Sequence, residues 1–514
     1  MNLDVKDLND DQTEIYNRVM EIMPKKRPSQ WDKMSQPLIY EVIQGVAGSG
    51  KTTLTSLLVR DLIARGLRVF CTAPTHKASQ ELERQYGNAA EIVENSAPIF
   101  GLDNVSSNDG PDFCGTIHSA LGLKPVGDDE KRTLKVTDFR RTTTAVGDKS
   151  GYSLCDVLFL DEGSMVGHLL EHHALERQGI DRFHIIVVGD SYQLDPVEDK
   201  DEESTDKSTK RSPVFDRGNE SFKLNNVTRQ AENSPIIQLS ALCRDNIDHV
   251  MDTELFPKPD GRVMQFVDHD TIHSMSNTKL VENYMQLINN DAYNALDNRI
   301  LTFTNERVDF YNYLIRQEIH RERLEAGEDI LDYEAGEIVI LQASIKDEPF
   351  SNSQEVLIND CVSDNVKILA PVEFNGGTML RYEEKSFDCY TMTISHITKD
   401  EQCQIQVIKA DQMKSFTLWM WEKAKLFKKI KADNRAGSKA GWGWFWETME
   451  SFPSLKYSFA STIHKAQGST FDNAIVDMNG IKDCMQYNQL LAWKLLYVGV
   501  TRPRHNLYLG VGEV

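Results

Sequence analysis

The sequence predicts an α/β protein with two parallel-sheet units and a small all-β insert in the second unit. Continuous apolar runs at 157–160 and 184–189 fit buried parallel strands. A second α/β unit opens at 299–305 and returns only near the end of the chain, at 474–477 and 506–509. Between these segments, roughly over 325–455, short strand-like runs separated by turn residues predict a β-barrel inserted into the second unit.

The composition is that of a soluble globular protein. The 514 residues should form roughly three to four domain-sized units, since ~100–200 residues is usual for one. No apolar run is long enough to span a bilayer, and the first residues do not begin a signal peptide. Eight cysteines are scattered without a CxxC pair, which indicates reduced thiols in a cytoplasmic compartment and argues against a zinc site. The net charge of −21 does not suggest nucleic acid, so any DNA path must be locally basic.

A glycine-rich turn lies between a predicted strand at 38–43 and a helical pattern that stops at Gly66. The turn consists of Gly45, Val46, Ala47, Gly48, Ser49, Gly50, Lys51, Thr52 and Thr53. Its glycines let the backbone fold closely around a phosphate, which the N–H groups and the helix N-terminus stabilise. Lys51 would reach the β- and γ-phosphates of ATP, and Thr52 would place its hydroxyl on Mg²⁺. The complete GxxxxGKT pattern in this setting makes a chance turn a poor explanation.

Polar residues follow other predicted elements of the first unit. Residues 8–19 read as a capped helix in which Gln12 could read an adenine edge, although an exposed glutamine is the simpler interpretation. Ligands bind at strand ends in open parallel sheets. Two such ends carry Pro74, Thr75 and His76, and Thr116 and His118. His76 could equally be a surface residue of the next helix.

Two carboxylates end the apolar strand at 157–160. Asp161 is placed to hold Mg²⁺, and Glu162 to act as the general base on an attacking water. After the strand at 184–189, Gln193 could hydrogen-bond the γ-phosphate or that water. The partly alternating segment 124–150 predicts a β-hairpin that projects from the sheet.

The end of the insert combines basic and aromatic residues. Met420, Ala424, Phe427 and Ile430 fall at helical spacing, and the opposite face carries Lys423, Lys425, Lys428, Lys429 and Lys431. Trp442, Trp444 and Trp446 follow. This combination suits single-stranded nucleic acid, whose bases stack on rings while lysines contact phosphates. An aromatic cluster that packs the insert against its host domain explains the same residues equally well.

Several motifs together resemble the superfamily 1 helicases, of the group that moves 5′ to 3′, and in particular the Dda-type helicases of tailed phages. The motifs that carry this resemblance span nearly the whole chain in the family's order. They are the segments 45–53, 73–76, 116–119, 160–162, 189–194, 461–468 and 496–502. The resemblance implies two RecA-like lobes with ATP and Mg²⁺ in the cleft between them.

The resemblance also implies a domain organisation. The first lobe would comprise 1–121 and 151–222, with a pin hairpin at 122–150 that splits the duplex. The second lobe would comprise 223–324 and 456–514, with an SH3-like barrel and helical tower at 325–455. The phage enzymes are generally shorter, and the polar stretches 96–111 and 198–212 are the additions in this chain. The pin aligns poorly, so Phe139 is only a candidate for its tip.

Roles for single residues follow from the same resemblance. Arg229 and Arg502 match the arginines that contact the γ-phosphate, and Gly468 would lie at the nucleotide. Single-stranded DNA would cross both lobes and touch Thr75, His76, Thr116, His118, Thr462 and His464. Trp442 and Trp446 match the family's Trp-x-x-x-Trp element on the DNA. The family implies a cytoplasmic monomer, in the host cytoplasm if phage-encoded, that acts on single-stranded and forked DNA alongside replication or recombination proteins and not at a membrane.

Three functions fit the sequence. The leading one is an ATP-driven helicase. The second is a translocase that strips bound proteins from single strands, and the third is a clamp whose DNA affinity is set by ATP. A base at Glu162 and two arginines argue against a pure clamp, because binding alone requires neither.

Overall fold

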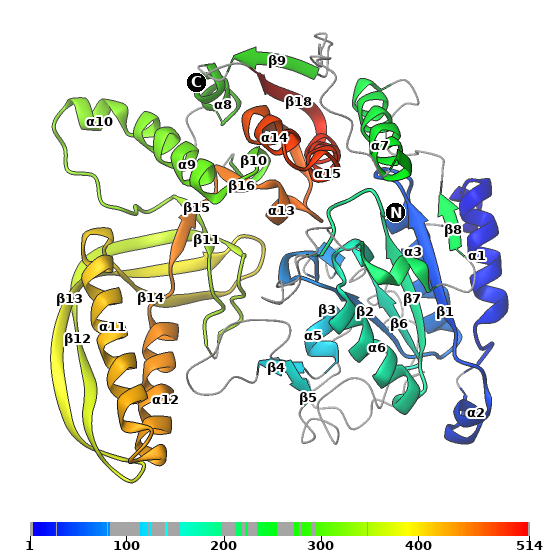
Figure 1. The fold of residues 1–514 in the computed structure, drawn as a ribbon. Helices are drawn as coiled ribbons and strands as arrows, with labels where there is room; N and C mark the ends of the chain where they lie inside the picture. The colour runs from blue at the N-terminus through cyan, green and yellow to red at the C-terminus, as the bar shows by residue number, and fades with distance from the viewer. Residues whose placement is uncertain are drawn as a thin grey trace.

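The computed structural model describes most of the chain. The described residues are 4–26, 28–79, 81–82, 114–121, 123–125, 139–141, 155–196, 211–217, 221–224, 234–253, 272–276, 279–288, 295–346 and 348–511. Figure 1 shows three bodies: a first lobe at the lower right, a second lobe at the top, and an insert at the lower left.

The first lobe is built on a six-stranded parallel sheet with an apolar core on each face. Alternate residues of its strands pack into the two cores: Ile186 lies in one, and Ile185 and Val187 lie in the other. The strand order is β3 (Cys114–Thr116), β2 (Val69–Ala73), β6 (Val157–Leu160), β7 (His184–Gly189), β1 (Tyr40–Gly45) and β8 (Ser221–Leu224). One face is covered by α1 (Asp10–Ile22) and α3 (Lys51–Ala64), and the other by α5 (Ile117–Ala120) and α6 (His168–Asp181). The short helix α2 (Gln30–Ser35) precedes β1.

The second lobe repeats this architecture with a five-stranded parallel sheet. Its order is β16 (Ala460–Thr462), β10 (Asn298–Thr302), β17 (Phe471–Asp477), β18 (Pro503–Val511) and β9 (Ile272–Ser276). Its described helices are α7 (Pro235–Thr253), α8 (Leu280–Ile288), α9 (Asn305–Ile319), α10 (Arg321–Glu325), α13 (Ile463–Ala466), α14 (Met478–Met485) and α15 (Gln489–Val500). The prediction of a second α/β unit that closes late in the chain is therefore confirmed.

The insert is a five-stranded antiparallel sheet with a pair of helices beside it. The sheet order is β14 (Gln402–Ile408), β13 (Thr378–His396), β12 (Glu355–Asn375), β11 (Ile338–Leu341) and β15 (Leu455–Tyr457). Helices α11 (Ala410–Ile430) and α12 (Arg435–Ser451) pack against each other along the β12–β13 hairpin (Figure 1). Two of the short strand-like runs within the insert, at 356–358 and 366–369, belong to the single strand β12. Residues 359–367 are exposed or half-buried on both faces, so no apolar alternation marks them as strand.

Two expected boundaries move by two residues each. The first lobe reaches residue 224 rather than 222, because β8 pairs with β1. The insert reaches residue 457 rather than 455, because β15 pairs with β11. Both strands are too short for their sequence to show the apolar–polar alternation of a β-strand.

The expected hairpin is present at its base. Strand β4 (Leu123–Pro125) pairs antiparallel with β5 (Phe139–Arg141), and Phe139 is the register partner of Pro125. Phe139 thus lies in a strand of the hairpin. Residues 126–138, where a tip would fall, lie outside the described residues, as do 96–111 and 198–210.

Candidate active site

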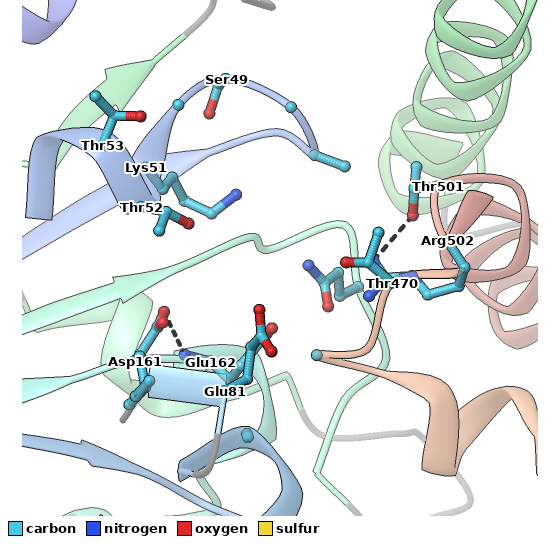
Figure 2. Close-up of a pocket in the computed structure, with 17 residues that line it drawn as sticks. Ser49, Lys51, Thr52, Thr53, Glu81, Asp161, Glu162, Thr470, Thr501 and Arg502 are labelled. Carbon is cyan, nitrogen blue, oxygen red and sulfur yellow. Dashed lines mark hydrogen bonds between the residues drawn. The ribbon is translucent and has the colours of Figure 1, made fainter. Parts of the chain in front are cut away.

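A cavity of about 330 Å³ lies between the two lobes. From the first lobe it is lined by residues 47–53 of the glycine-rich turn and by Ala78, Glu81, Leu82, Asp161, Glu162 and Gln193. From the second lobe it is lined by Gly468, Thr470, Thr501 and Arg502. Figure 2 shows Lys51 above the cavity, Asp161 and Glu162 below it, and Arg502 facing them from the second lobe.

The glycine-rich turn has the geometry of a phosphate-binding loop. Gly48 and Gly50 have φ angles of 80° and 77°, a region that glycine enters without steric cost. A Cβ at Gly45 would lie 2.5 Å from Ser49 Oγ, so the close turn needs glycine there as well. Lys51 Nζ donates to the carbonyl oxygens of Gly45 and Val46, at 2.6 and 3.0 Å. This ammonium group therefore lies inside the loop, where a phosphate would compete for it.

Asp161 and Thr52 have the right chemistry for a magnesium ion. Both line the cavity, and Asp161 Oδ1 accepts a hydrogen bond of 2.8 Å from the backbone N–H of Glu162. Burial raises the pKa of the Asp161 carboxyl, a cost that a bound cation would offset. Mg²⁺ in nucleotide sites commonly uses one or two protein oxygens together with substrate phosphates. These two side chains fit that requirement.

Glu162 is held in an unusual backbone conformation at the end of β6. Its φ of 51° lies in the left-handed region, which costs a non-glycine residue on the order of 1–3 kcal/mol. Burial, and secondarily the charge of Asp161, raises the pKa of Glu162 to about 7. A carboxyl with a pKa near neutral pH is suited to take a proton from water.

Gln193 and Arg502 reach the cavity from opposite sides. Gln193 Oε1 is buried and has no hydrogen-bond partner among the described residues, which leaves it available to a ligand. The Arg502 guanidinium donates to the carbonyl oxygen of Val498, to that of Ser469 and to the hydroxyl of Thr501, at 3.0, 3.1 and 3.0 Å. Arg502 is thereby fixed against its own lobe. Arg229 lies outside the described residues, so its role stays a prediction.

Gln12 lies beside the phosphate loop, and its contact with adenine stays a prediction. Its side-chain oxygen accepts from Asn9 N–H at 3.0 Å, and its amide nitrogen donates to the Ser49 carbonyl oxygen at 3.1 Å. Gln12 is buried and does not line the cavity. It completes a capping box on α1 and ties that helix to the phosphate loop.

A second cavity, of about 270 Å³, adjoins the first. The two share Ala47, Gly48, Thr470 and Thr501 as lining residues. The rest of its wall combines the apolar side chains of Ile236, Ile237 and Pro503 with Ser240, Arg504 and His505.

Contacts between the lobes leave no mark in any local sequence pattern. Tyr497 of α15 reaches the phosphate loop, Lys494 of α15 pairs with Asp195, and Gln467 Nε2 donates to Ser164 Oγ at 2.9 Å. Tyr497 lies within the motif at 496–502, which is the one signal that singled out this region. A contact between residues about 300–450 positions apart leaves no local pattern.

The residues expected on DNA lie at matching positions in the two lobes. Thr116 and Thr462 each end a strand and cap the next helix, through hydrogen bonds of 3.2 Å from Ser119 N–H and Lys465 N–H. A histidine follows two residues later in both lobes. Burial, and then the charges of His76 and His173, lowers the pKa of His118 to about 4, and burial also lowers that of His464.

A second pair of threonines follows the neighbouring strands. The hydroxyl of Thr75, after Pro74 and β2, accepts from Ala78 N–H at 3.2 Å. The hydroxyl of Thr304, after β10, accepts from Arg307 N–H at 3.4 Å and caps α9. Because β2 pairs with β3 and β10 with β16, each lobe presents two threonine-capped strand ends side by side.

The tryptophans lie on helix α12, which favours packing for two of them. Trp442 is 6% exposed and packs edge-on against Phe427, so it offers little surface to a base. Trp444 packs edge-on against Trp419, as expected for the middle ring. Trp446 is half-buried, and its ring stacks on that of Trp442 with centroids 6.4 Å apart. Of the expected DNA-stacking pair, only Trp446 offers a partly open face.

Lys423 does not belong to the basic face of the tower helix. It is buried, and its Nζ lies 2.6 Å from Glu383 Oε2 and over the ring of Trp419. Lys425, Lys428 and Lys429 are exposed as expected.

Three further features concern the cysteines, membrane-spanning helices and metal-binding clusters. All eight cysteines are free thiols. In the part of the chain that the structure describes, no helix has the length and apolarity needed to cross a membrane, and no cluster of three metal-binding side chains occurs.

Comparison with known proteins identifies relatives over the whole chain. Family models match in order along it: an AAA domain at 32–255, the Dda helicase SH3 domain at 332–457, and a UvrD-like helicase C-terminal domain at 457–509. The ATP-dependent DNA helicase Dda of Enterobacteria phage T4 is 26% identical over 530 residues, which cover 98% of this chain and 99% of that protein.

Two weaker similarities also extend over nearly the whole chain. An uncharacterized protein of Acanthamoeba polyphaga mimivirus is 21% identical over 90% of this chain and 93% of its own length. The crystal structure of the Pif1 helicase from Candida albicans superposes with a TM-score of 0.46 at 14% identity, covering 98% of this chain and 95% of that one. The order of the matching domain models and the end-to-end similarity to Dda lead to one conclusion. By these matches, the chain is similar along nearly its whole length to the ATP-dependent DNA helicase Dda.

Proposed function

We propose that this protein is an ATP-dependent DNA helicase that moves 5′ to 3′ along single-stranded DNA and unwinds forked duplexes. The observation that carries the proposal is the cavity between the lobes, where a phosphate loop, a raised-pKa glutamate and a buried arginine from the other lobe face one another. Such a site hydrolyses ATP only when the lobes are together. The direction of movement rests on the family resemblance alone.

ATP would occupy the two adjoining cavities. The triphosphate fits the one lined by the glycine-rich turn, and the nucleoside fits the one with apolar walls. Lys51 would exchange its bonds to Gly45 and Val46 for the β- and γ-phosphates. Thr52 and Asp161 would hold Mg²⁺, which neutralises phosphate charge when bound.

The chain's own groups account for the hydrolytic step. Glu162 accepts the proton of the attacking water, and Gln193 orients that water or the γ-phosphate through its unpartnered oxygen or its amide group. Arg502 stabilises the negative charge that develops on the transferred phosphoryl group. The bonds that Arg502 now makes to Val498 and Ser469 limit the reorganisation that this requires.

DNA would lie across the capped strand ends of both lobes. Each threonine-capped helix start presents backbone N–H groups that suit a phosphate. The neutral histidines beside Thr116 and Thr462 can contact DNA without adding a fixed charge. Four equivalent contacts, two from each lobe, let one lobe hold the strand while the other moves.

The decisive experiment compares unwinding of two forked duplexes, one with a single-stranded 5′ tail and one with a 3′ tail, with ATP and with a non-hydrolysable analogue. We expect strand separation from the 5′ tail with ATP only. Separation from the 3′ tail alone would contradict the direction and leave the hydrolytic site unaffected. ATP-driven displacement of a bound protein without strand separation would favour the translocase, and ATP-dependent DNA affinity without turnover would favour the clamp.

A further inference from the structure

Tyr497 joins the two lobes at the nucleotide site through one hydroxyl group. The side chain is fully buried on α15 of the second lobe. Its oxygen accepts a hydrogen bond of 3.0 Å from Ala47 N–H in the phosphate loop and donates one of 2.6 Å to Asp190 Oδ2. A phenylalanine would fill the same space, so the hydroxyl is present for these two partners.

Both partners belong to the catalytic side of the first lobe. Ala47 lines the cavity. Asp190 is 1% exposed and holds the turn that carries Gln193, since its backbone oxygen accepts from Gln193 N–H at 3.1 Å and its Oδ1 from Tyr192 N–H at 3.1 Å. The Tyr497 hydroxyl thus contacts the phosphate loop and the Gln193 turn at once.

On the other side, Tyr497 is tied to Arg502 through the last turn of α15. Thr501 donates its N–H and its hydroxyl to the Tyr497 carbonyl oxygen, at 3.2 and 2.9 Å. The Arg502 guanidinium in turn donates to the Thr501 hydroxyl and to the Val498 carbonyl oxygen, both at 3.0 Å. The position of Arg502 relative to the phosphate loop is therefore set by a short chain of bonds that passes through Tyr497.

We propose that Tyr497 is a positioning residue: its hydroxyl sets the distance between Arg502 and the phosphate loop when the cleft is closed. The inference rests on the proposed function, because it concerns ATP hydrolysis stimulated by DNA. Tyr497 lines neither of the two cavities, so loss of its hydroxyl lowers turnover and leaves nucleotide affinity largely intact.

The test uses the full-length Tyr497→Phe variant, with turnover measured at saturating single-stranded oligothymidylate. We expect kcat to fall on the order of tenfold, as for loss of a hydrogen bond to a charged group, with KM for ATP nearly unchanged. The matched control is Tyr284→Phe, which removes a buried hydroxyl that donates to the Asn298 carbonyl oxygen at 3.0 Å, away from the cavity. If Tyr284→Phe lowers kcat by the same factor, the fall in Tyr497→Phe reflects a general loss of stability, and the proposal is overturned.

A double variant separates positioning from an independent role. If Tyr497 acts through Arg502, then adding Tyr497→Phe to Arg502→Ala produces no further loss of kcat, whereas independent effects multiply. Multiplying effects, or wild-type kcat in Tyr497→Phe, would overturn the inference. If Tyr497→Phe does not fold, Asp190→Asn tests the same contact from the first lobe, because it replaces a charge-assisted bond with a weaker neutral one. It should lower kcat by a smaller factor at unchanged KM, and unchanged kcat would again contradict the proposal.

Wild-type protein is measured first to keep the two proposals apart. A wild-type protein without DNA-stimulated hydrolysis overturns both the proposed function and this inference. If DNA stimulates ATP hydrolysis by the wild-type protein but Tyr497→Phe has a wild-type kcat, only the inference about Tyr497 is overturned.

Discussion

Lys494 Nζ lies 2.6 Å from Asp195 Oδ1, and the two side chains, 3% and 10% exposed, come from different lobes. Burial lowers the pKa of Lys494 and raises that of Asp195, so each charge depends on the other for compensation. Separation of the lobes would expose both groups to water, where neither needs a partner. Opening of the cleft at this point is therefore less costly than the number of buried contacts suggests.

The first prediction concerns the hydrolytic base. Glu162→Gln should abolish turnover and retain ATP binding, because Glu162 acts on water and not on the phosphates. Lys51→Ala should abolish turnover and also weaken ATP binding, since Lys51 contacts the ground state. The measurements are steady-state hydrolysis and binding of a fluorescent ATP analogue.

A second acidic residue at the cavity provides the comparison for that prediction. Glu81 also lines the cavity and points into it in Figure 2. Glu81→Gln should retain most of the turnover. Loss of hydrolysis in Glu81→Gln together with near wild-type hydrolysis in Glu162→Gln would move the base to Glu81.

The second prediction concerns pH. Because Glu162 must be unprotonated to act and its pKa is raised to about 7, kcat/KM for ATP should fall as the pH drops through about 7. A profile that stays flat down to pH 5 would show that Glu162 is already ionised in the free enzyme.

Ionisation of Glu162 should also affect the stability of the fold. Whereas kcat/KM rises as the pH rises through about 7, the stability contributed by Glu162 falls. Between the ordinary carboxyl pKa of 4.5 and about 7, the folded protein binds more protons than the unfolded chain. The contribution of Glu162 is therefore fully present below pH 4.5 and is lost as the pH rises through about 7. Glu162→Gln, which keeps no charge, should unfold at higher urea concentration than wild type at pH 8 and show a smaller difference at pH 5.

The third prediction concerns Arg502. An arginine that stabilises the transition state of phosphoryl transfer increases kcat by roughly 10³–10⁵. Arg502→Ala should remove the DNA-stimulated hydrolysis and leave affinity for single-stranded DNA largely unchanged, as measured by fluorescence anisotropy. The control is Arg321→Ala, an exposed arginine of the same lobe that pairs with Glu318. Normal DNA stimulation in Arg502→Ala would place Arg502 outside the transition state.

The fourth prediction separates the tryptophans. Trp442→Ala should lower the melting temperature, because loss of a buried tryptophan costs about 3–5 kcal/mol. Trp444→Ala should lower it less, because this ring is only half-buried. Trp446→Ala should weaken single-strand affinity if a base stacks there, by about 1–3 kcal/mol. DNA affinity and melting temperature are measured side by side for the three variants. A lower melting temperature for Trp446→Ala at unchanged affinity would assign the whole cluster to packing.

Local patterns predicted the parts of the site that lie within one segment. The phosphate loop, the strand that ends in Asp161 and Glu162, and the Gln193 turn each combine a strand signal with a chemical motif, and the structure brings them to one cavity. Both parallel-sheet units and the antiparallel insert were predicted for the same reason. The hairpin at 124–150 was recognised at its base from partial alternation and flanking glycines.

The remaining features depend on contacts that no local pattern records. In the sequence, Gln12 resembles an exposed helix residue. In the structure, its side-chain oxygen accepts from the N–H of Asn9 at the helix cap, and its side-chain nitrogen donates to the phosphate loop. The sequence places Lys423 on a solvent-exposed helix face. In the structure it is buried, and its ammonium group pairs with Glu383 on the neighbouring hairpin. Tyr497 lies in the apolar run 495–500 of α15, and only its contacts with the first lobe show why a hydroxyl is needed there.

The long paired helices beside the β12–β13 hairpin have a mechanical consequence. Helix α11 has 21 residues, and at ~1.5 Å per residue it extends about 30 Å. The insert is anchored to the second lobe by Arg316, whose Nε donates to Glu337 Oε1 at 2.8 Å, and by the two-residue link between β15 and β16. A rotation of the second lobe of only about 6° would sweep the far end of such an arm by about 3 Å, close to the ~3.4 Å spacing of successive nucleotides. A rotation of that size would therefore be enough to move the far end of the insert by about the length of one nucleotide.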